Sequence, residues 1–280
     1  MIEIAVSAEW VKHHLGDDAV VVVDGSWHLP PENRNARAEY EANHIPGAIF
    51  FDLDYHSDRE SNLPHTMPSA EQFGREMSAL GISDQHKIIV YDSVGLFSAA
   101  RIWWMFKVFG ADKVFLLDGG LPAWKAAGFP TEVGTVQRPV TAFNASFDPT
   151  NLVALSEISG GLDSGGNGVI LDARSPGRFR GEEAEPRPGV RPGHIPGSSN
   201  LHYRSLLDDE MKMLPPDALE ARFAEANYDP SAPAIASCGS GVTACIILAA
   251  AHRLGYTNLR LYDGSWSEWG ADESVPVERG

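Results

Sequence analysis

The sequence predicts an α/β fold made of two copies of one unit, each a mostly parallel sheet flanked by helices. Two observations indicate this class. Short runs of valine, isoleucine and leucine alternate with longer helical patterns, as in strands joined by helical crossovers. Landmarks in the first half of the chain also recur 145 to 150 residues later and in the same order.

Five landmarks carry the repeat, and one shared tetrapeptide alone would be weak support. The matched pairs are Val20–Asp24 with Val169–Asp172, His44–Gly47 with His194–Gly197, Ile88–Asp92 with Ala234–Cys238, Asp118–Gly120 with Asp263–Ser265, and Trp124 with Trp269. In the first copy we expect strands near 20–24, 48–51, 88–92 and 114–118, and helices near 7–15, 69–80 and 97–109.

The repeat divides the chain into a first domain at 1–133, a linker at 134–149 and a second domain at 150–280. The linker is proposed because this stretch contains Pro139 and Pro149 and has no hydrophobic periodicity. The Gly, Ser and Asn residues of 160–168 predict a turn inside the second copy rather than a domain boundary.

Composition narrows the possible partners. The 280 residues include 38 acidic and 22 basic side chains, for a net charge of −16, which would repel nucleic acid and anionic membranes. No apolar run of membrane-spanning length and no signal pattern is visible. The two cysteines, Cys238 and Cys245, suit neither a disulfide scaffold nor a metal site, so we expect a cytoplasmic protein.

The chain is organised around Cys238. An apolar run at 232–236 precedes it as a buried strand, and 245–254 follows as a helix. Glycines in the intervening turn allow several N–H groups to point inward, and the helix start adds a positive dipole, so both favour the reactive thiolate. The alternative is a buried structural cysteine.

Several other residues are interpreted as structural. His44 and His194 occur in both copies, whereas only the second copy has the cysteine, and Asp92 stands at the equivalent position of the first. The aromatic stripe around Trp103 and Trp104 is expected to pack in the core or at a domain interface. Cys245, about two helical turns beyond Cys238, is expected to pack in the protein interior rather than to act as a resolving thiol.

These features together resemble the tandem-domain sulfurtransferases of the rhodanese family. The resemblance rests on the paired His-Ile-Pro-Gly turns, the Asp-Gly-Gly and Asp-Gly-Ser turns and the tryptophan six residues after each. It implies two rhodanese-like domains, of which the second carries the catalytic cysteine and the first is inactive.

The loop sequence resembles that of the mercaptopyruvate-specific members, which implies a substrate-binding role for Gly239, Gly241, Val242 and Thr243. Thiosulfate enzymes typically have basic residues where Gly239 and Ser240 stand, which suits a small dianion. The resemblance further implies that Arg178 and Arg187 grip the substrate carboxylate and carbonyl. The alternative is a solvated loop whose arginines pair with Glu182, Glu183 and Glu185.

The resemblance also implies a relay of Asp54, His65 and Ser240, in which Asp54 orients His65 and the histidine moves a proton through Ser240. From spacing alone, Asp54 and His65 are ordinary loop residues of the first domain. If the relay exists, the active cleft lies between the domains. Phe97 stands where related enzymes can have a tyrosine.

The predicted activity is transfer of sulfur from 3-mercaptopyruvate, through a persulfide on Cys238, to a thiol such as reduced thioredoxin or to cyanide, with release of pyruvate. It needs no metal or organic cofactor. The alternatives are thiosulfate:cyanide sulfurtransfer and a non-catalytic persulfide carrier. A cysteine phosphatase is disfavoured because its loop needs an arginine at the position of Ala244.

Overall fold

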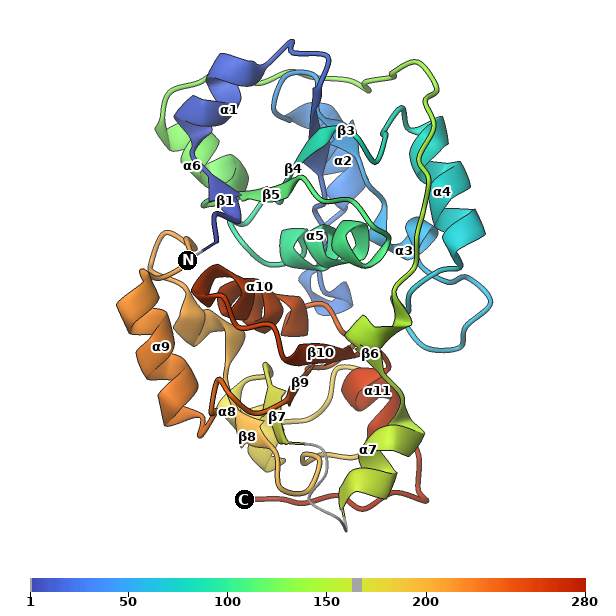
Figure 1. The fold of residues 1–280 in the computed structure, drawn as a ribbon, viewed down its shortest axis with the longest axis vertical. Helices are drawn as coiled ribbons and strands as arrows, with labels where there is room; N and C mark the ends of the chain where they lie inside the picture. Colours follow the sequence, from blue (N-terminus) through green and yellow to red (C-terminus); the bar gives the residue numbers. More distant parts are fainter. Residues whose placement is uncertain (1, 163–167) are drawn as a thin grey trace.

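The computed structural model describes residues 2–162 and 168–280 and shows two five-stranded parallel sheets, one in each half of the chain (Figure 1). The strand order is β1-β5-β4-β2-β3 in the first sheet and β6-β10-β9-β7-β8 in the second. Corresponding strands take the same place in the two sheets, so the repeat predicted from the sequence is also a repeat of topology. The predicted fold class is confirmed.

The elements of the first half are β1 (Ala5–Val6), α1 (Ala8–His14), β2 (Val20–Asp24), a 3-10 helix (Pro30–Glu32), α2 (Ala36–Ala42), β3 (Ile49–Phe50), α3 (Leu53–His56), α4 (Ala70–Ala79), β4 (Lys87–Tyr91), α5 (Ala99–Val108), β5 (Val114–Leu117) and α6 (Gly120–Ala126). Those of the second are a 3-10 helix (Pro149–Asn151), β6 (Leu152–Val153), α7 (Leu155–Leu162), β7 (Val169–Asp172), α8 (Pro176–Arg180), β8 (Ser199–Asn200), a 3-10 helix (Tyr203–Leu206), α9 (Pro216–Glu225), β9 (Ala234–Ser237), α10 (Ala244–Leu254), β10 (Leu259–Tyr262) and α11 (Ser265–Trp269).

Both faces of the first sheet are buried. Val21 and Val23 of β2 lie in one apolar cluster, whereas Val20 and Val22 lie in another, because successive side chains of a strand point to opposite faces. A parallel sheet buried on both faces has continuous apolar strands, which explains why the run Val20–Asp24 was recognisable in the sequence.

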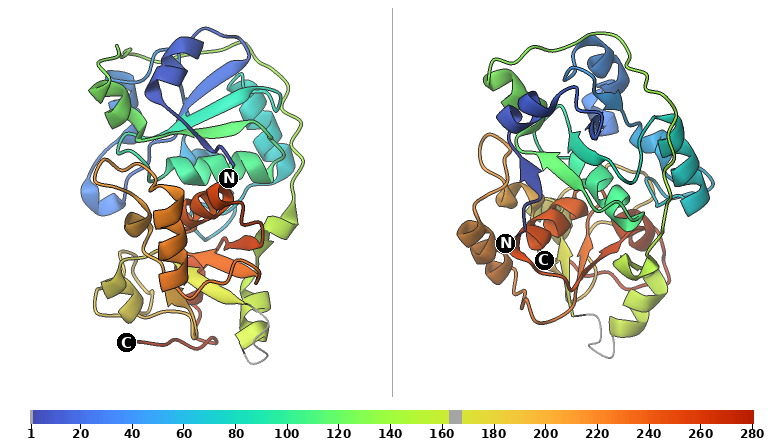
Figure 2. Two further views of the ribbon diagram at one scale, coloured as in Figure 1. Left: turned by 60° about the vertical axis from the view of Figure 1, so that its left-hand side comes forward. Right: turned by 45° about the horizontal axis from the view of Figure 1, so that its top comes forward.

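The two halves meet through α5 and α10, which pack against each other in all three views of the ribbon (Figures 1 and 2). One apolar cluster includes residues of both helices. The rings of Trp103 and His252 lie 5.6 Å apart across this contact. Trp103 and Trp104 are buried, so the predicted packing role of the aromatic stripe is confirmed.

The four predicted strands of the first copy are present, within two residues of the predicted ends, as β2 to β5. The prediction missed β1, which has only two residues, and the short helices α2, α3 and α6, which lack enough turns for a clear period. Residues 160–162 belong to α7 rather than to the predicted turn, and the turn's residues 163–167 lie outside the described residues.

The stretch predicted as a linker is held against the first sheet's helices. The N–H of Phe143 donates to the Ser78 hydroxyl, and the N–H of Ser146 donates to the carbonyl of Phe109. The proposed limits of 1–133, 134–149 and 150–280 stay a prediction.

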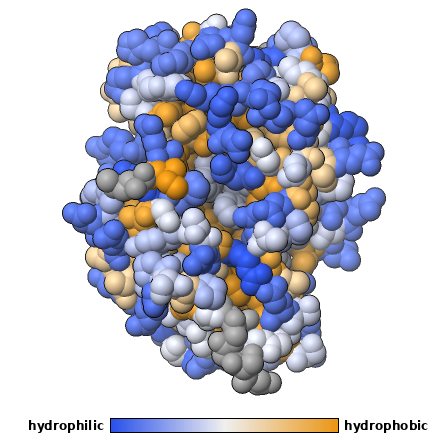
Figure 3. All heavy atoms as spheres, viewed as in Figure 1, coloured by the Kyte–Doolittle hydropathy of each residue, from blue (hydrophilic) through white to orange (hydrophobic). Residues whose placement is uncertain are grey.

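The surface shown in Figure 3 is mostly hydrophilic, with small hydrophobic patches scattered over it. None of the helices in the described ranges has the length and apolar character needed to span a bilayer.

A buried carboxylate organises the first copy's equivalent of the cysteine loop. Asp92 is 1% exposed, and its two oxygens accept hydrogen bonds from four backbone amides at 2.7 to 3.0 Å: those of Val94, Gly95, Phe97 and Ala99. The loop therefore folds around an internal anion, which satisfies amides that would otherwise be buried without an acceptor.

Replacing Asp92→Ala is expected to lower the free energy of unfolding by about 3 kcal/mol or more, because four buried amides lose their acceptor. Urea denaturation measures this change. The control is Asp229→Ala, which removes an exposed carboxylate bound to the N–H of Ser231 and is expected to cost less than about 1 kcal/mol. Equal small losses in both variants would contradict the role given to Asp92.

Candidate active site

Cys238 lies at the carboxyl end of β9, in the turn that leads into α10. This turn is shaped by contacts to its carbonyl oxygens. The carbonyl of Cys238 accepts the N–H of Trp266, and that of Gly239 accepts both the N–H and the hydroxyl of Ser267. The carbonyl of Gly241 accepts from Cys245 Sγ at 3.2 Å and from Arg101 Nη1 at 3.4 Å.

These contacts fix the direction of the loop's amides. In a trans peptide the N–H points away from the carbonyl of the preceding residue. Anchoring the carbonyls of Cys238, Gly239 and Gly241 on one side therefore turns the following N–H groups to the other. Within the described ranges, none of the amides of residues 239–243 has a hydrogen-bond acceptor, and the N-terminus of α10 adjoins them. Such a concave set of donors suits an anion.

A cavity of about 190 Å³ lies over this loop. Residues of both domains line it: Trp27, Leu29 and Phe97 from the first, and Ala173, Arg174, Ser175, Arg178, Pro186, Arg187, His202, Tyr203, Cys238, Gly239, Ser240, Val242 and Thr243 from the second. Cys238 is only 2% exposed, so a small molecule reaches its sulfur through this cavity. Burial lowers the pKa of His202, which leaves the arginines as the cations of the cavity at neutral pH.

Arg178 and Arg187 both line the cavity, but they have different partners. Arg178 donates to Glu185 with Nη2, at 2.5 Å, and with Nε, at 3.3 Å. No ion pair is formed by Arg187 with any residue that the structure describes. Burial lowers the pKa of Arg187, and the negative charge of Cys238 opposes this effect. Arg178 thus forms one of the ion pairs named in the alternative, but the side chain of its partner Glu185 is buried rather than solvated, and Arg178 lines the cavity.

The guanidinium of Arg178 lies close to Gly239, the residue that follows Cys238. A Cβ on Gly239 would lie 3.1 Å from Arg178 Nη2. A longer side chain at this position would displace the guanidinium. The cation over the loop is thus Arg178 of α8 rather than a basic residue of the loop itself.

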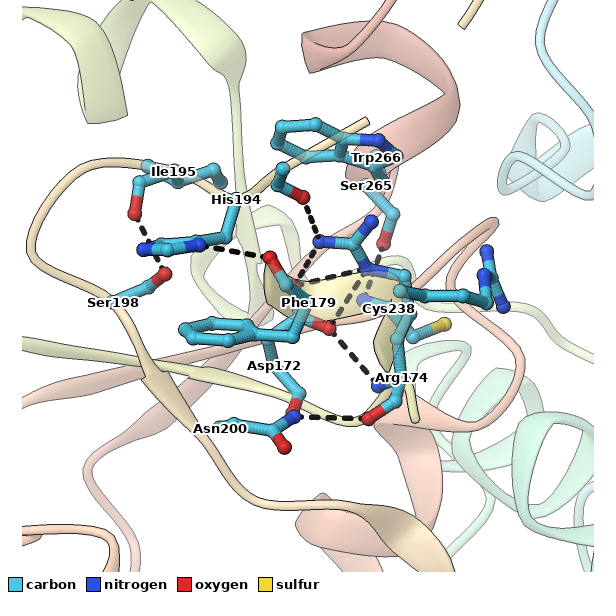
Figure 4. A network of polar contacts seen from close by, with 12 residues as sticks. Asp172, Arg174, Phe179, His194, Ile195, Ser198, Asn200, Cys238, Ser265 and Trp266 are labelled. Carbon is cyan, nitrogen blue, oxygen red and sulfur yellow. Dashed lines mark hydrogen bonds and ion pairs between the residues drawn. The ribbon is translucent and has the colours of Figure 1, made fainter. Parts of the chain in front are cut away.

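Glu185 also joins Arg178 to a buried ionic network behind Cys238, which Figure 4 shows around Arg174. Arg174 binds Glu185 at 2.8 Å and Asp172 at 2.7 Å, and it lies over the ring of Trp266 at 4.3 Å. Its side chain is fully buried, so the paired carboxylates offset the cost of removing the charge from water. This network connects the end of β7, Arg178 of α8 and Trp266 of α11.

The sequence-predicted relay is assembled between the domains. His65 Nδ1 lies 3.2 Å from Ser240 Oγ, and Nε2 lies 2.9 Å from Asp54 Oδ1. Because Asp54 accepts from Nε2–H, Nδ1 is left to accept from the Ser240 hydroxyl. Trp27 Nε1 also donates to Asp54, at 3.2 Å. These hydrogen bonds run from the buried Ser240 through His65 to the exposed Asp54, and so connect the cavity to solvent.

Electrostatics favour a neutral histidine in this relay. Burial lowers the pKa of His65, although the hydrogen bond and charge of Asp54 oppose the shift. The hydrogen bond to His65 is in turn the main cause that lowers the pKa of Asp54. Near pH 7, the ring of His65 is therefore neutral and lies beside the carboxylate of Asp54. In this state His65 can take a proton from Ser240.

A larger cavity, of about 410 Å³, lies along β1 on another part of the surface. Its lining includes Asp118, Lys212 and Arg253, but no cysteine or histidine is among the described residues that form it. Size alone does not identify the site, because the smaller cavity contains Cys238, the loop amides and Arg187, which has no ion pair among the described residues.

The structure brings together every predicted site residue: Cys238, Ser240, His65, Asp54, Arg178, Arg187, Gly239, Gly241, Val242 and Thr243. His44 and His194 instead bind backbone carbonyls with Nδ1, and Cys245 is fully buried in α10, as expected for structural residues. Sequence reasoning missed Trp27 and Arg101. No local pattern marks either residue as part of the site, since each reaches it only through the packing of one domain on the other.

This fold and this site define a class of protein. The family model for the rhodanese-like domain matches residues 7–127 and again 155–272. The chain belongs to the tandem rhodanese-domain sulfurtransferases.

Known relatives cover nearly the whole chain. It is 43% identical to a 3-mercaptopyruvate sulfurtransferase of Escherichia coli, over 98% of this chain and 97% of the relative. It is 41% identical to the mitochondrial thiosulfate/3-mercaptopyruvate sulfurtransferase 1 of Arabidopsis thaliana, over 99% of this chain and 78% of the relative. A crystal structure of a 3-mercaptopyruvate sulfotransferase from Escherichia coli superimposes with a TM-score of 0.87 and 38% identity, over 95% of this chain and 99% of that one.

The relay gives a testable pKa. Replacing Asp54→Asn is expected to lower the pKa of His65 further, because the charge that opposes the effect of burial is lost. Titration of the histidine ring protons by NMR measures it. His252, whose pKa is also lowered by burial, lies at the α5–α10 contact and serves as the internal control. A rise in the His65 midpoint in this variant would refute the arrangement.

Proposed function

We propose that the protein transfers sulfur from 3-mercaptopyruvate to a thiol acceptor through a persulfide on Cys238, and releases pyruvate. The observation that carries the proposal is a loop of amides around Cys238, at the base of a cavity that also holds Arg187; within the described part of the chain, these amides have no acceptor and Arg187 has no ion pair. Relatives named for this donor share 41 to 43% identity with the chain, which supports the same assignment.

In the first step, the substrate carboxylate binds Arg187, and the free edge of Arg178 holds the neighbouring carbonyl. The Cys238 thiolate attacks the thiol sulfur of mercaptopyruvate, and an S–S bond forms while the C–S bond breaks. The electron pair of that bond leaves on carbon as the enolate of pyruvate. The proton of the transferred S–H is then available for the methylene carbon, which becomes the methyl group of pyruvate.

The relay moves that proton. The neutral His65, with Nδ1 facing the Ser240 hydroxyl, accepts a proton through Ser240 and returns it to the enolate carbon. Asp54 stabilises the imidazolium that forms in between. The outer sulfur is left as an anion, which the amides of 239–243 stabilise. An acceptor thiolate then attacks the outer sulfur and releases Cys238 as thiolate.

The first alternative is transfer from thiosulfate. The Arabidopsis relative, named for both donors, keeps this alternative open. The cavity favours the keto acid because Glu185 already pairs with Arg178, so that, of the two arginines, only Arg187 lacks a carboxylate partner among the described residues. A dianion as small as thiosulfate is better matched by several unpaired cations.

The second alternative is a persulfide carrier that hands sulfur to a partner without multiple turnovers. The relay favours an enzyme, because a carrier does not need a histidine and a carboxylate to move protons at the substrate. We propose a thiol protein such as reduced thioredoxin as the acceptor and the cytoplasm as the compartment. Both free cysteines, which form no disulfide, are compatible with a reducing environment.

A steady-state comparison of donors tests the proposal. With 2-mercaptoethanol as acceptor, pyruvate release from mercaptopyruvate should be abolished by Cys238→Ser, and the value of kcat/KM should be higher for mercaptopyruvate than for thiosulfate. A higher value for thiosulfate would replace the proposed donor. Formation of one persulfide per chain with no further turnover would instead favour the carrier.

Charge at the cavity gives a second prediction. Arg187→Gln is expected to raise KM for mercaptopyruvate about tenfold or more, because a charge-assisted hydrogen bond to the substrate carboxylate is lost. The matched control is Arg180→Gln. Arg180 lies on α8 but is exposed and pairs with Glu182, so its loss should leave KM within twofold. Equal KM values in both variants would remove Arg187 from the substrate site.

A further inference from the structure

Arg101 of α5 reaches from the first domain to the loop that carries Cys238. Its side chain is fully buried and does not line the cavity. Nη1 forms an ion pair with Asp263 at 2.8 Å and donates to the carbonyl of Gly241 at 3.4 Å. Nη2 donates to the carbonyl of His65. One guanidinium therefore contacts the cysteine loop and the segment of the relay histidine.

Together with Cys245 Sγ, Arg101 holds the carbonyl of Gly241 and so fixes where the next amide points. Because the carbonyl of Gly241 faces Arg101, the N–H of Val242 faces the opposite side, and Val242 lines the cavity with Cys238. Gly241 has φ +74, and a Cβ there would lie 3.0 Å from Arg101 Nη1. The close approach of the arginine to the loop thus requires a glycine at this position.

The contact with His65 holds a strained residue. His65 has φ +62, in the left-handed region that non-glycine residues rarely adopt. The Arg101–Asp263 pair binds the backbone of residues 65–67. Arg101 donates to the carbonyl of His65, and Asp263 Oδ2 accepts the N–H of Met67 at 2.7 Å. These contacts offset the strain and leave the ring of His65 directed at Ser240.

We propose that Arg101 is a positioning residue for the reaction: it aligns the Val242 amide with the reacting sulfur and His65 with Ser240, without touching the substrate. The inference rests on the proposed sulfur transfer. A purely structural arginine would need only its ion pair with Asp263. Arg101 also donates from Nη1 to the carbonyl of Gly241 and from Nη2 to the carbonyl of His65. It also makes the active loop dependent on the packing of the first domain.

The test is Arg101→Lys, which keeps the buried charge and its pairing with Asp263 but cannot reach both carbonyls. We expect the rate constant for alkylation of Cys238 by iodoacetamide at pH 7.5 to fall about tenfold, because the loop stabilises the thiolate less well. The kcat for pyruvate release should fall at least about tenfold, with KM within threefold, since Arg178 and Arg187 are unchanged. The ratio of kcat/KM for mercaptopyruvate and thiosulfate should not change.

The control is Arg191→Lys. Among the described residues, the guanidinium of Arg191 donates only to backbone carbonyls, those of Trp269, Gly270, Asp272 and Val275, away from the cavity. Its alkylation rate and kcat should stay within twofold of the parent, whatever its melting temperature.

A merely structural Arg101 predicts the opposite sign, because loosened packing exposes Cys238 and speeds alkylation; an unchanged or faster rate in Arg101→Lys overturns the inference. If that variant does not fold, Asp263→Asn takes its place with the same expectation and the same overturning result. Alkylation needs no sulfur donor, so this test gives its answer even if the proposed donor is wrong.

Discussion

The active loop depends on where its carbonyl oxygens are held. Three of them, on Cys238, Gly239 and Gly241, are bound by α11, by Cys245 and by Arg101 on the side away from the cavity. The amides that follow are thereby turned toward the cavity, where a negative sulfur atom would satisfy them. The carbonyl oxygens on the outer side of this loop have hydrogen-bond donors within the protein, whereas the N–H groups on the inner side are available to an anion.

The two copies of the fold show two solutions to the same problem. In the first, the carboxylate of Asp92 accepts hydrogen bonds from four amides of the loop. In the second, Cys238 stands at the equivalent position and the amides have no acceptor among the described residues. The first copy still contributes to the site: His65 and Arg101 contact the cysteine loop across the interface, and Asp54 binds His65.

Much of this architecture could be predicted from the sequence because its signals are local. The buried strands are continuous apolar runs, and the repeat makes each landmark visible twice. Cys238 is marked by its own glycines, whereas Arg178 and Arg187 become a pair only through the family resemblance. Arg101, Trp27 and the ion pair of Glu185 with Arg178 could not be predicted, because they depend on how two domains and two separate loops pack. A single buried arginine in an apolar helix gives no sign of which carbonyls it will meet.

The most direct measurement is a crystal structure of the protein treated with mercaptopyruvate in the absence of an acceptor. We expect a second sulfur on Cys238, within hydrogen-bonding distance of the amides of residues 239–243, with the guanidinium of Arg187 at the emptied carboxylate position. An unmodified Cys238 after pyruvate has been released, or an outer sulfur turned away from those amides, would contradict it.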